Sequence, residues 1–257
     1  MINLIRRFLF KYCKFLLKHK EFNTEVTFNC NFDSMEEVEK RFYIHDNLFY
    51  NNNDTLFVKD MLEITDDGLV IKCKKQPGKA KTWQFPEERN YNYLSGCITT
   101  YNKDDNWDRF TQVNGVWSID AIFPETWAAF WLLHPDYFVP KTGKKHIVPE
   151  VDVAESNGRG IDNVLHYGYD KIKYSTKGRL RKMHKKIDGK LHNYAVEILD
   201  DRYIFYLDGY RINTFKIDDP ESIAKGQPYY LVLNNAIGVL VKKDYSEFII
   251  KNIKVYK

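Results

Sequence analysis

Three carboxylic acids, Glu150, Asp152 and Glu155, stand within six consecutive positions of this sequence. Carboxylates held this close together cannot all stay ionised at neutral pH without cost, so one of them can remain a protonated acid. That division suits the cleavage of a glycosidic bond, in which one carboxylate attacks while an acid protonates the leaving oxygen. An acidic strand that binds a cation such as Ca²⁺ would use the same residue types. From the cluster alone, both interpretations stay open.

The residues between the acids predict a strand, because Val151 and Val153 are β-branched and no helical period fits. Strict alternation would place the first two acids on one face and Glu155 on the other. One extra residue, a β-bulge around Val153-Ala154, would return Glu155 to the face of the other two. The two glutamates would then lie about 13 Å apart along the backbone, at ~3.3 Å per residue. Side chains that lean towards each other can narrow this gap to the ~5–5.5 Å of a retaining glycosidase.

From about residue 24 onward, the chain has the pattern of many short strands. In Gly68–Lys74, for example, apolar Leu69, Ile71 and Cys73 occupy alternate positions and share one face. Further β-rich runs are Ser95–Tyr101, Val113–Phe123, Ala128–Leu133, Val148–Glu155, Tyr194–Leu199, Tyr203–Leu207, Arg211–Ile217, Tyr229–Asn234 and Phe248–Tyr256.

The sequence also contains a turn signal and a few short segments of helical pattern. Asp208-Gly209 separates two of the strand-like runs and predicts a type I′ hairpin, which needs positive φ at both central residues. Helical pattern is confined to the basic N-terminus, Ser34–Arg41 and Pro220–Ala224. Many short strands without βαβ alternation predict an all-β fold, an antiparallel β-sandwich, and 257 residues suit one such domain.

Charge and cysteine usage exclude several classes of protein. Residues 1–20 carry six Lys or Arg and no acid, whereas the other 237 residues hold 33 basic and 35 acidic side chains. The body has no dense basic patch with interleaved aromatics, so a nucleic-acid partner is not expected. The basic stretch Lys177–Lys186 could meet an anionic sugar or phosphate, or could be a solvated loop. The four cysteines lack metal-ligand spacing, so we expect no zinc site and no cofactor.

Residues 1–22 form a separate basic amphipathic segment ahead of the domain at residues 23–257. In a helix, the basic side chains would share one face and apolar side chains another, which is typical of a helix at a membrane surface or protein partner. An arm that packs on the domain is the alternative. Lys11 and Lys14 interrupt the apolar run, so neither a cleaved signal peptide nor a spanning helix is expected. The sequence leaves the localisation open.

Seven segments, in order, resemble the motifs of glycoside hydrolase family 16, the laminarinase, lichenase, agarase and carrageenase group. They are Tyr93–Thr99, Trp127–Leu133, Glu150–Glu155, Leu191–Glu197, Ile204–Gly209, Tyr230–Asn234 and Ile253–Tyr256. The ordered set is more specific than any single motif, and it runs from about residue 23 to the C-terminus. The resemblance implies a concanavalin-like jelly roll that acts on a β-linked polysaccharide, a glucan or a galactan.

The resemblance also implies roles for individual residues. Glu150 would be the nucleophile, Glu155 the general acid/base and Asp152 the residue that tunes both. Trp131 would be a platform for a sugar ring beside the cleaved bond, because an apolar sugar face packs well on an indole. Core packing of Trp131 against a second sheet is the alternative.

Further residues of the substrate-binding site follow from the same resemblance. Trp127 and Asn234 belong to family motifs, and His166 occupies a position where many family members place a cleft histidine. A lone histidine on a strand is more often an ordinary hydrogen-bonded group, and this alternative stays open.

One strand departs from the family pattern. Where family members commonly carry Glu and Arg that point into the cleft, this chain has Ser118 and Asp120, so both are expected to line the cleft. The departure puts the substrate in doubt rather than the mechanism. Two other functions compete with a hydrolase: a non-catalytic carbohydrate-binding sandwich, and a virion- or cell-surface protein that engages glycans.

Overall fold

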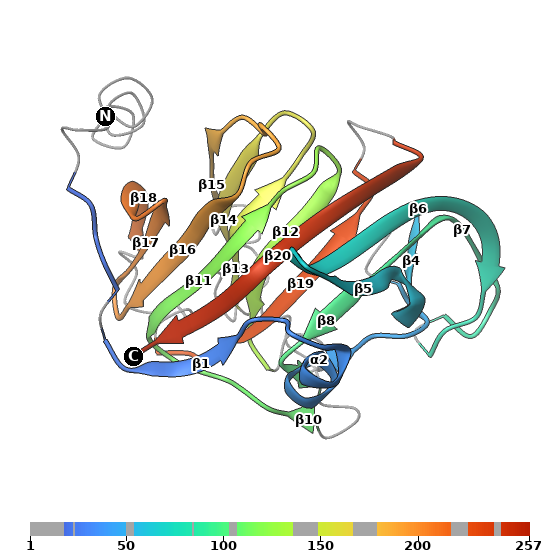
Figure 1. Cartoon of the computed structure of the whole chain (residues 1–257), viewed down its shortest axis with the longest axis horizontal. Helices are drawn as coiled ribbons and strands as arrows, with labels where there is room; N and C mark the ends of the chain where they lie inside the picture. Colours follow the sequence, from blue (N-terminus) through green and yellow to red (C-terminus); the bar gives the residue numbers. More distant parts are fainter. Residues whose placement is uncertain are drawn as a thin grey trace, which may run out of the picture.

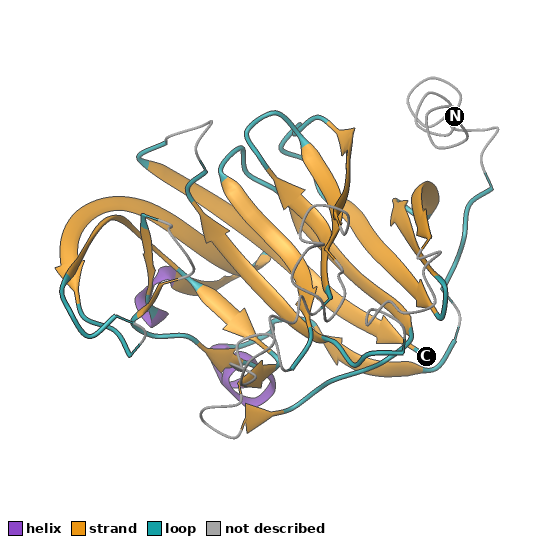
Figure 2. Cartoon of the chain, turned by 180° about the vertical axis from the view of Figure 1, so that it is seen from behind, coloured by secondary structure: helices purple, strands orange, loops and turns teal. Residues whose placement is uncertain are grey.

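The chain folds into two large β-sheets that pack face to face, and Figures 1 and 2 show the computed structural model from opposite sides. The structure describes residues 18–22, 24–49, 54–83, 85–102, 107–135, 149–166, 179–216, 226–238 and 243–257. The predicted antiparallel β-sandwich is confirmed. Residues 1–17 of the basic segment and the expected helix at Pro220–Ala224 lie outside the described residues.

The larger sheet has eleven strands and is antiparallel except where β4 runs parallel to β7. In spatial order it contains β18 (Tyr210–Lys216), β17 (Arg202–Leu207), β16 (His192–Leu199), β11 (Gly115–Ile122), β20 (Tyr245–Tyr256), β6 (Gly68–Ala80), β7 (Arg89–Ser95), β4 (Thr55–Phe57) and β3 (Leu48–Phe49). Two more strands pair alongside it: β1 (Val26–Cys30) with β20 and β5 (Leu62–Thr65) with β6.

The smaller sheet has seven strands, all antiparallel to their neighbours. In spatial order it contains β15 (Arg179–Lys185), β14 (Ile161–His166), β13 (Glu150–Ser156), β12 (Trp127–Leu133), β19 (Tyr230–Ala236), β8 (Cys97–Thr99) and β2 (Tyr43–Ile44). The acidic strand β13 therefore lies inside the sheet, held by β12 on one side and β14 on the other. A separate pair joins β9 (Tyr101–Asn102) to β10 (Trp107–Asp108).

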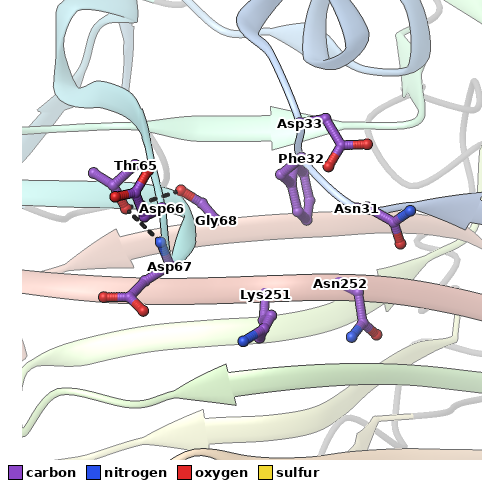
Figure 3. A pocket seen from close by; sticks show the side chains of 9 residues that line it. All are labelled: Asn31, Phe32, Asp33, Thr65, Asp66, Asp67, Gly68, Lys251 and Asn252. Carbon is purple, nitrogen blue, oxygen red and sulfur yellow. Dashed lines mark hydrogen bonds between the residues drawn. The ribbon is translucent and has the colours of Figure 1, made fainter.

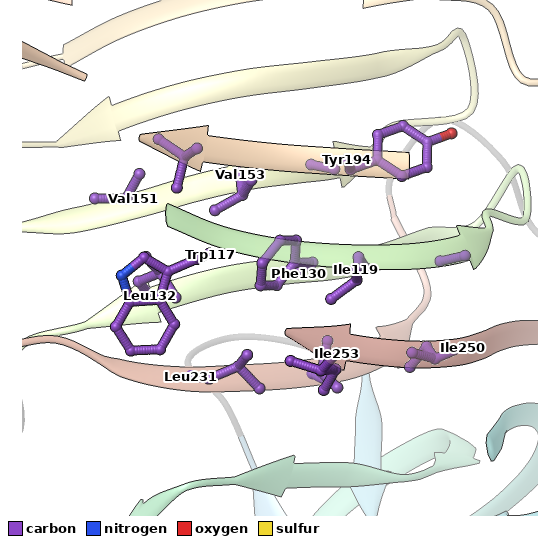
Figure 4. Packing of buried hydrophobic residues seen from close by; sticks show 14 of the residues in the cluster. Trp117, Ile119, Phe130, Leu132, Val151, Val153, Tyr194, Leu231, Ile250 and Ile253 are labelled. Carbon is purple, nitrogen blue, oxygen red and sulfur yellow. The ribbon is translucent and has the colours of Figure 1, made fainter. Parts of the chain in front are cut away.

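One hydrophobic core fills the space between the two sheets (Figure 4). Alternate residues of each strand face it, so Trp117 and Ile119 of β11 pack with Phe130 and Leu132 of β12, and all four are fully buried. Burial of each such side chain contributes about 1.5–3 kcal/mol. Because the period of a strand is two, the residues between them must face away from the core. Each sheet thus has one outer face on which polar residues can lie.

Local signals in the sequence explain the turn and the helix. Asp208 and Gly209 have φ of 49° and 72°, so the predicted type I′ hairpin between β17 and β18 is confirmed. Helix α2 (Met35–Arg41) begins at the N-cap Ser34, whose hydroxyl accepts a hydrogen bond from the backbone N–H of Glu37 at 3.1 Å. Within the described parts of the chain, no helix is long and apolar enough to cross a membrane.

Three cysteines fall in the described segments and behave as small buried hydrophobes. Cys30, Cys73 and Cys97 are all buried, and none of them forms a disulfide. Burial raises the pKa of the Cys30 and Cys73 thiols to about 12, so both stay protonated at neutral pH. The fold of the sandwich therefore rests on its core rather than on covalent cross-links.

Candidate active site

A β-bulge in β13 brings the three acids to one face of the seven-stranded sheet. Asp152 pairs with Val164 of β14 and Glu155 pairs with Asp162, so three steps along β13 oppose two along β14. The same irregularity occurs against β12. Val153 and Ala154 are consecutive residues, and both are buried in the core. Because two residues in a row face inward, Glu155 lies on the outer face again. The bulge predicted from the spacing of the acids is confirmed.

His166 lies between the first two acids. It pairs with Glu150 in the register of β13 and β14, and its Nε2 atom is 3.7 Å from Oε1 of Glu150 and 3.5 Å from Oδ2 of Asp152. Asp152 is almost completely buried, and the other two side chains are largely covered. An imidazole between two carboxylates offsets part of their mutual repulsion when it is protonated.

The same three residues could hold a cation. Their ligand atoms lie within 4.8 Å of one another, and they form a candidate group of this kind in the described part of the chain. A hard cation such as Ca²⁺ takes six to eight oxygen ligands, and this group offers two carboxylates and one nitrogen. The group therefore offers fewer oxygen ligands than Ca²⁺ takes.

Glu155 receives a hydrogen bond from a neighbouring indole. The Nε1–H of Trp127 donates to Oε1 of Glu155 over 2.5 Å, and Trp127 is itself 37% exposed. The residue after Glu155 is locked to the adjacent strand, because the Ser156 hydroxyl accepts from the backbone N–H of Ala128 at 2.8 Å. Glu155 is therefore fixed between the bulge on one side and this cross-strand contact on the other.

Trp131 lies on the same face as the acids and not in the main core. Its position pairs with Asp152 on β13 and with Val232 on β19. The indole Nε1–H donates to Oδ1 of Asn234 over 2.7 Å, and the ring remains partly exposed. Of the two alternatives for Trp131, the structure supports a ring on the acidic face.

Several residues on this face were not anticipated from the sequence. Asp162 sits opposite Glu155 on β14, is 2% exposed, and accepts hydrogen bonds from Arg181 of β15 and from Asn157. Arg181 belongs to the basic stretch Lys177–Lys186, but no pattern in the sequence indicates that it pairs with Asp162. At the opposite edge of the sheet, the ring of Tyr43 packs edge-on against that of His45 at 4.9 Å.

The expectation that Ser118 and Asp120 line the cleft is wrong. Both lie on β11 in the eleven-stranded sheet, between core-facing neighbours, and so they face outward on the side of the sandwich away from β13. There Asn193 donates to Ser118 Oγ and to Asp120 Oδ1, both over 2.8 Å, and Asn252 donates to Asp120 Oδ2 over 2.7 Å. Ser118, Asp120, Asn193 and Asn252 thus form a hydrogen-bonded group, which we call the outer amide cluster.

A separate pocket of about 440 Å³ opens on the eleven-stranded sheet (Figure 3). It is lined by residues 31–33, 65–68 and 251–252, none of which belongs to the acidic face. The site built from Glu150, Asp152 and Glu155 is therefore distinct from this pocket.

Comparison with known proteins identifies the fold. No protein-family model matches the sequence, and no curated protein matches it. The solved laminarinase catalytic domain of Thermotoga maritima MSB8 matches with a TM-score of 0.73 at 18% identity, covering 92% of this chain and 99% of that one. The laminarinase of Flavobacterium sp. UMI-01 has a TM-score of 0.71 at 23% identity, over 91% and 100% of the two chains. SCLam, a non-specific endo-β-1,3(4)-glucanase from family GH16, gives 0.71 at 17% identity over 94% and 95%.

The fold is that of the family 16 glycoside hydrolases. The resemblance carried by the seven sequence segments is thus confirmed for the architecture, and the jelly roll it implies is present. On this family 16 fold, the acidic face combines groups that can attack, donate a proton and stack on a ring, all within neighbouring strands β12, β13 and β14. The arrangement is suited to general acid/base and nucleophilic chemistry on a sugar polymer.

Proposed function

We propose that this protein is a retaining endo-glycosidase that hydrolyses a β-linked polysaccharide, a glucan or a galactan. The observation that carries the proposal is the bulged register of β13, which presents Glu150, Asp152 and Glu155 on one face beside two tryptophans of β12. A strand without the bulge would send Glu155 into the core, where it could not meet a substrate. The laminarinase and endo-glucanase activities of proteins with the same fold support the choice of a β-glucan.

The proposed reaction is a double displacement. A carboxylate oxygen of Glu150 forms a bond to the anomeric carbon as the glycosidic C–O bond breaks, and the proton of Glu155 goes to the leaving oxygen. Glu155, now ionised, takes a proton from water, and the resulting hydroxide displaces Glu150 from the anomeric carbon. Two inversions give net retention. A sugar hydroxyl in place of water would give transglycosylation through the same intermediate.

The neighbours of the two glutamates have supporting roles in this proposal. His166 lies within 4 Å of both Glu150 and Asp152, so the imidazole holds the two carboxylates beside each other. The indole N–H of Trp127 orients Glu155. Trp131, steadied by its hydrogen bond to Asn234, offers a flat apolar surface to a sugar ring beside the cleaved bond.

A substrate screen tests the proposal. The wild-type protein is incubated with laminarin, mixed-linkage glucan, agarose, carrageenan and capsular polysaccharides, and oligosaccharide products are measured. We expect release of oligosaccharides of several lengths from at least one β-linked polymer. Products from none of them, or products unchanged in both Glu150→Ala and Glu155→Ala, would contradict the enzyme and favour a non-catalytic glycan-binding sandwich. Binding of a polymer without cleavage, measured by affinity electrophoresis, would identify that alternative directly.

A further inference from the structure

Two buried asparagines connect the sheets directly behind the bulge of β13. Asn163 of β14 and Asn213 of β18 are 1% and 0% exposed, and each belongs to a different sheet. An amide in an apolar core is costly unless its polar atoms are hydrogen-bonded. Neither residue touches the acidic face, and neither belongs to the seven family-like segments. Their burial therefore calls for a physical explanation.

The bulge supplies that explanation. A β-bulge interrupts the ladder of backbone hydrogen bonds and leaves the extra residue without its regular partner. The extra residue here is Val153, which is 1% exposed, so water cannot serve its carbonyl group. The amide NH₂ of Asn163 donates to this carbonyl oxygen of Val153 over 2.6 Å. A side chain thus replaces the backbone partner that the irregular register removes.

The direction of the hydrogen bonds is fixed by the backbone. A carbonyl can only accept, so Asn163 must turn its NH₂ towards Val153 and its own carbonyl oxygen away. That oxygen accepts a hydrogen bond from the NH₂ of Asn213 in the opposite sheet. The hydrogen bond from Asn213 therefore stabilises the amide orientation of Asn163 that serves the bulge.

We propose that Asn163 is a positioning residue that stabilises the β-bulge and thereby keeps Glu155 on the acidic face, with Asn213 orienting its amide. Without the bulge, Glu155 would return to the core-facing side of β13 in the regular alternation. Loss of the Asn163 hydrogen bond leaves a buried carbonyl unpaired and favours a register in which that carbonyl is paired again. The inference rests on the proposed function, since it assigns the bulge to the placement of a general acid/base.

The test uses two substrates that differ in their need for an acid. Once the screen has identified the sugar, kcat/KM is measured on the polymer and on a 2,4-dinitrophenyl glycoside of the same sugar. Dinitrophenolate leaves without a proton, so its kcat/KM depends on the nucleophile and not on Glu155. For Asn163→Leu we expect kcat/KM to fall about 10²-fold on the polymer, as for a misplaced catalytic group, and less than about threefold on the dinitrophenyl glycoside. A general loss of folded protein would lower both values equally.

Asn235→Leu is the matched control. Asn235 is an equally buried amide of the same sheet, on β19, and it bonds to Ile71, Thr126 and Ser246 rather than to β13. We expect this variant to lower the melting temperature while the ratio of the two kcat/KM values stays within about twofold of wild type. If Asn163→Leu does not fold, Asn213→Ala serves instead, with an expected fall of about tenfold in the same ratio because the amide of Asn163 is no longer oriented.

A crystal structure of the Asn163→Leu or Asn213→Ala variant separates the inference from the proposed function. We expect a changed register at Val153 or a displaced Glu155. An intact bulge with Glu155 in place, or an unchanged ratio of kcat/KM values, would overturn the role of Asn163. If the wild-type protein cleaves no glycoside at all, the proposed function fails, and the structure of the variant still decides whether Asn163 holds the bulge.

Discussion

The two outer faces of this sandwich both carry polar residues, but the surroundings of their acidic side chains differ. In the outer amide cluster of the eleven-stranded sheet, neutral amides enclose Asp120, with Asn193 on one oxygen and Asn252 on the other. Nearby on the same face, Glu197 accepts from Lys20 at 2.5 Å and from Tyr206 at 2.6 Å. No second acid joins either carboxylate through these contacts. Both of these acids therefore have their hydrogen-bond partners close by.

On the acidic face of the seven-stranded sheet, carboxylates converge instead. Glu150 and Asp152 approach the same imidazole, and Glu155 stands opposite Asp162 in the register. Such an arrangement costs stability through like-charge repulsion, and a protein retains it where the chemistry needs it. The comparison teaches that an outward-facing acid is not in itself a functional signal. What distinguishes the acidic face from the outer amide cluster is that its acids converge beside the tryptophans Trp127 and Trp131 of β12.

We expect the largest effect on activity from substitutions on the acidic face, and almost none from a substitution in the outer amide cluster. We expect Glu150→Ala and Glu155→Ala each to lower kcat/KM on the polymer about 10³-fold or more, because they remove the nucleophile or the acid/base. Asp120→Ala on the opposite face should leave kcat/KM within about threefold of wild type. Comparable losses in all three variants would break the distinction between the faces.

Loss of the proposed sugar platform should produce the next largest effect. Trp131→Ala removes an aromatic surface worth about 1.5–3 kcal/mol when a ring covers it, which corresponds to a ten- to hundredfold rise in KM. Trp131→Phe keeps a flat ring and should recover most of the affinity. Initial-rate kinetics on the polymer measure both, and an unchanged KM in the alanine variant would contradict a stacking role.

A single hydrogen bond to Glu155 should have a smaller effect. Trp127→Phe keeps an aromatic ring but removes the N–H that donates to Oε1 of Glu155, a hydrogen bond worth about 0.5–1.5 kcal/mol. We therefore expect kcat to fall by up to about tenfold with little change in KM. If KM rises and kcat does not change, Trp127 contacts the substrate rather than Glu155.

In the outer amide cluster we expect an effect on stability alone. In Asp120→Asn, an amide NH₂ would face the NH₂ of Asn193 or Asn252, so one hydrogen bond is lost at about 1–2 kcal/mol. Differential scanning calorimetry should show a melting temperature lower by a few degrees. KM should stay at the wild-type value, and a changed KM would place Asp120 in contact with the substrate after all.

The smallest expected effect on catalysis concerns the N-terminal segment. Its described residues pack on the larger sheet: Lys20 pairs with Glu197, and Phe22 contacts the rings of Tyr206 and Tyr256. Deletion of residues 1–17 preserves these contacts and should leave kcat/KM unchanged. We expect the full chain, but not the shortened one, to co-sediment with vesicles of anionic lipid, as a basic amphipathic helix would. Equal sedimentation of both proteins would instead favour an arm that packs on the domain.

The architecture was largely predictable because local patterns report it directly. The β-branched residues between Glu150, Asp152 and Glu155 predicted a strand, and the hypothesis that all three acids share one face predicted the bulge that the register of β13 contains. The Asp208-Gly209 turn and the helical pattern at Ser34–Arg41 are equally local signals, since each depends on the conformational preferences of a few neighbouring residues.

The surroundings of the site were less predictable, because alternation says that a residue faces away from the core but not which outer face it occupies. The family resemblance predicts that Ser118 and Asp120 line the cleft, whereas the structure has them on the other side of the sandwich. Asp162 and Asn163 gave no signal, since a single Asp or Asn in a strand says nothing of its partners. Their significance depends on Arg181 and Asn213, which only the folded chain brings near them.

The stereochemistry of the first product tests the central claim most directly, that Glu150 and Glu155 act as a retaining pair on one face. The cleavage of the polymer identified by the screen is followed by ¹H NMR of the new reducing end, before the anomers equilibrate. We expect that the β-anomer forms first and that neither Glu150→Ala nor Glu155→Ala produces it at a comparable rate. Initial formation of the α-anomer would contradict the account, because it would require a single displacement by water.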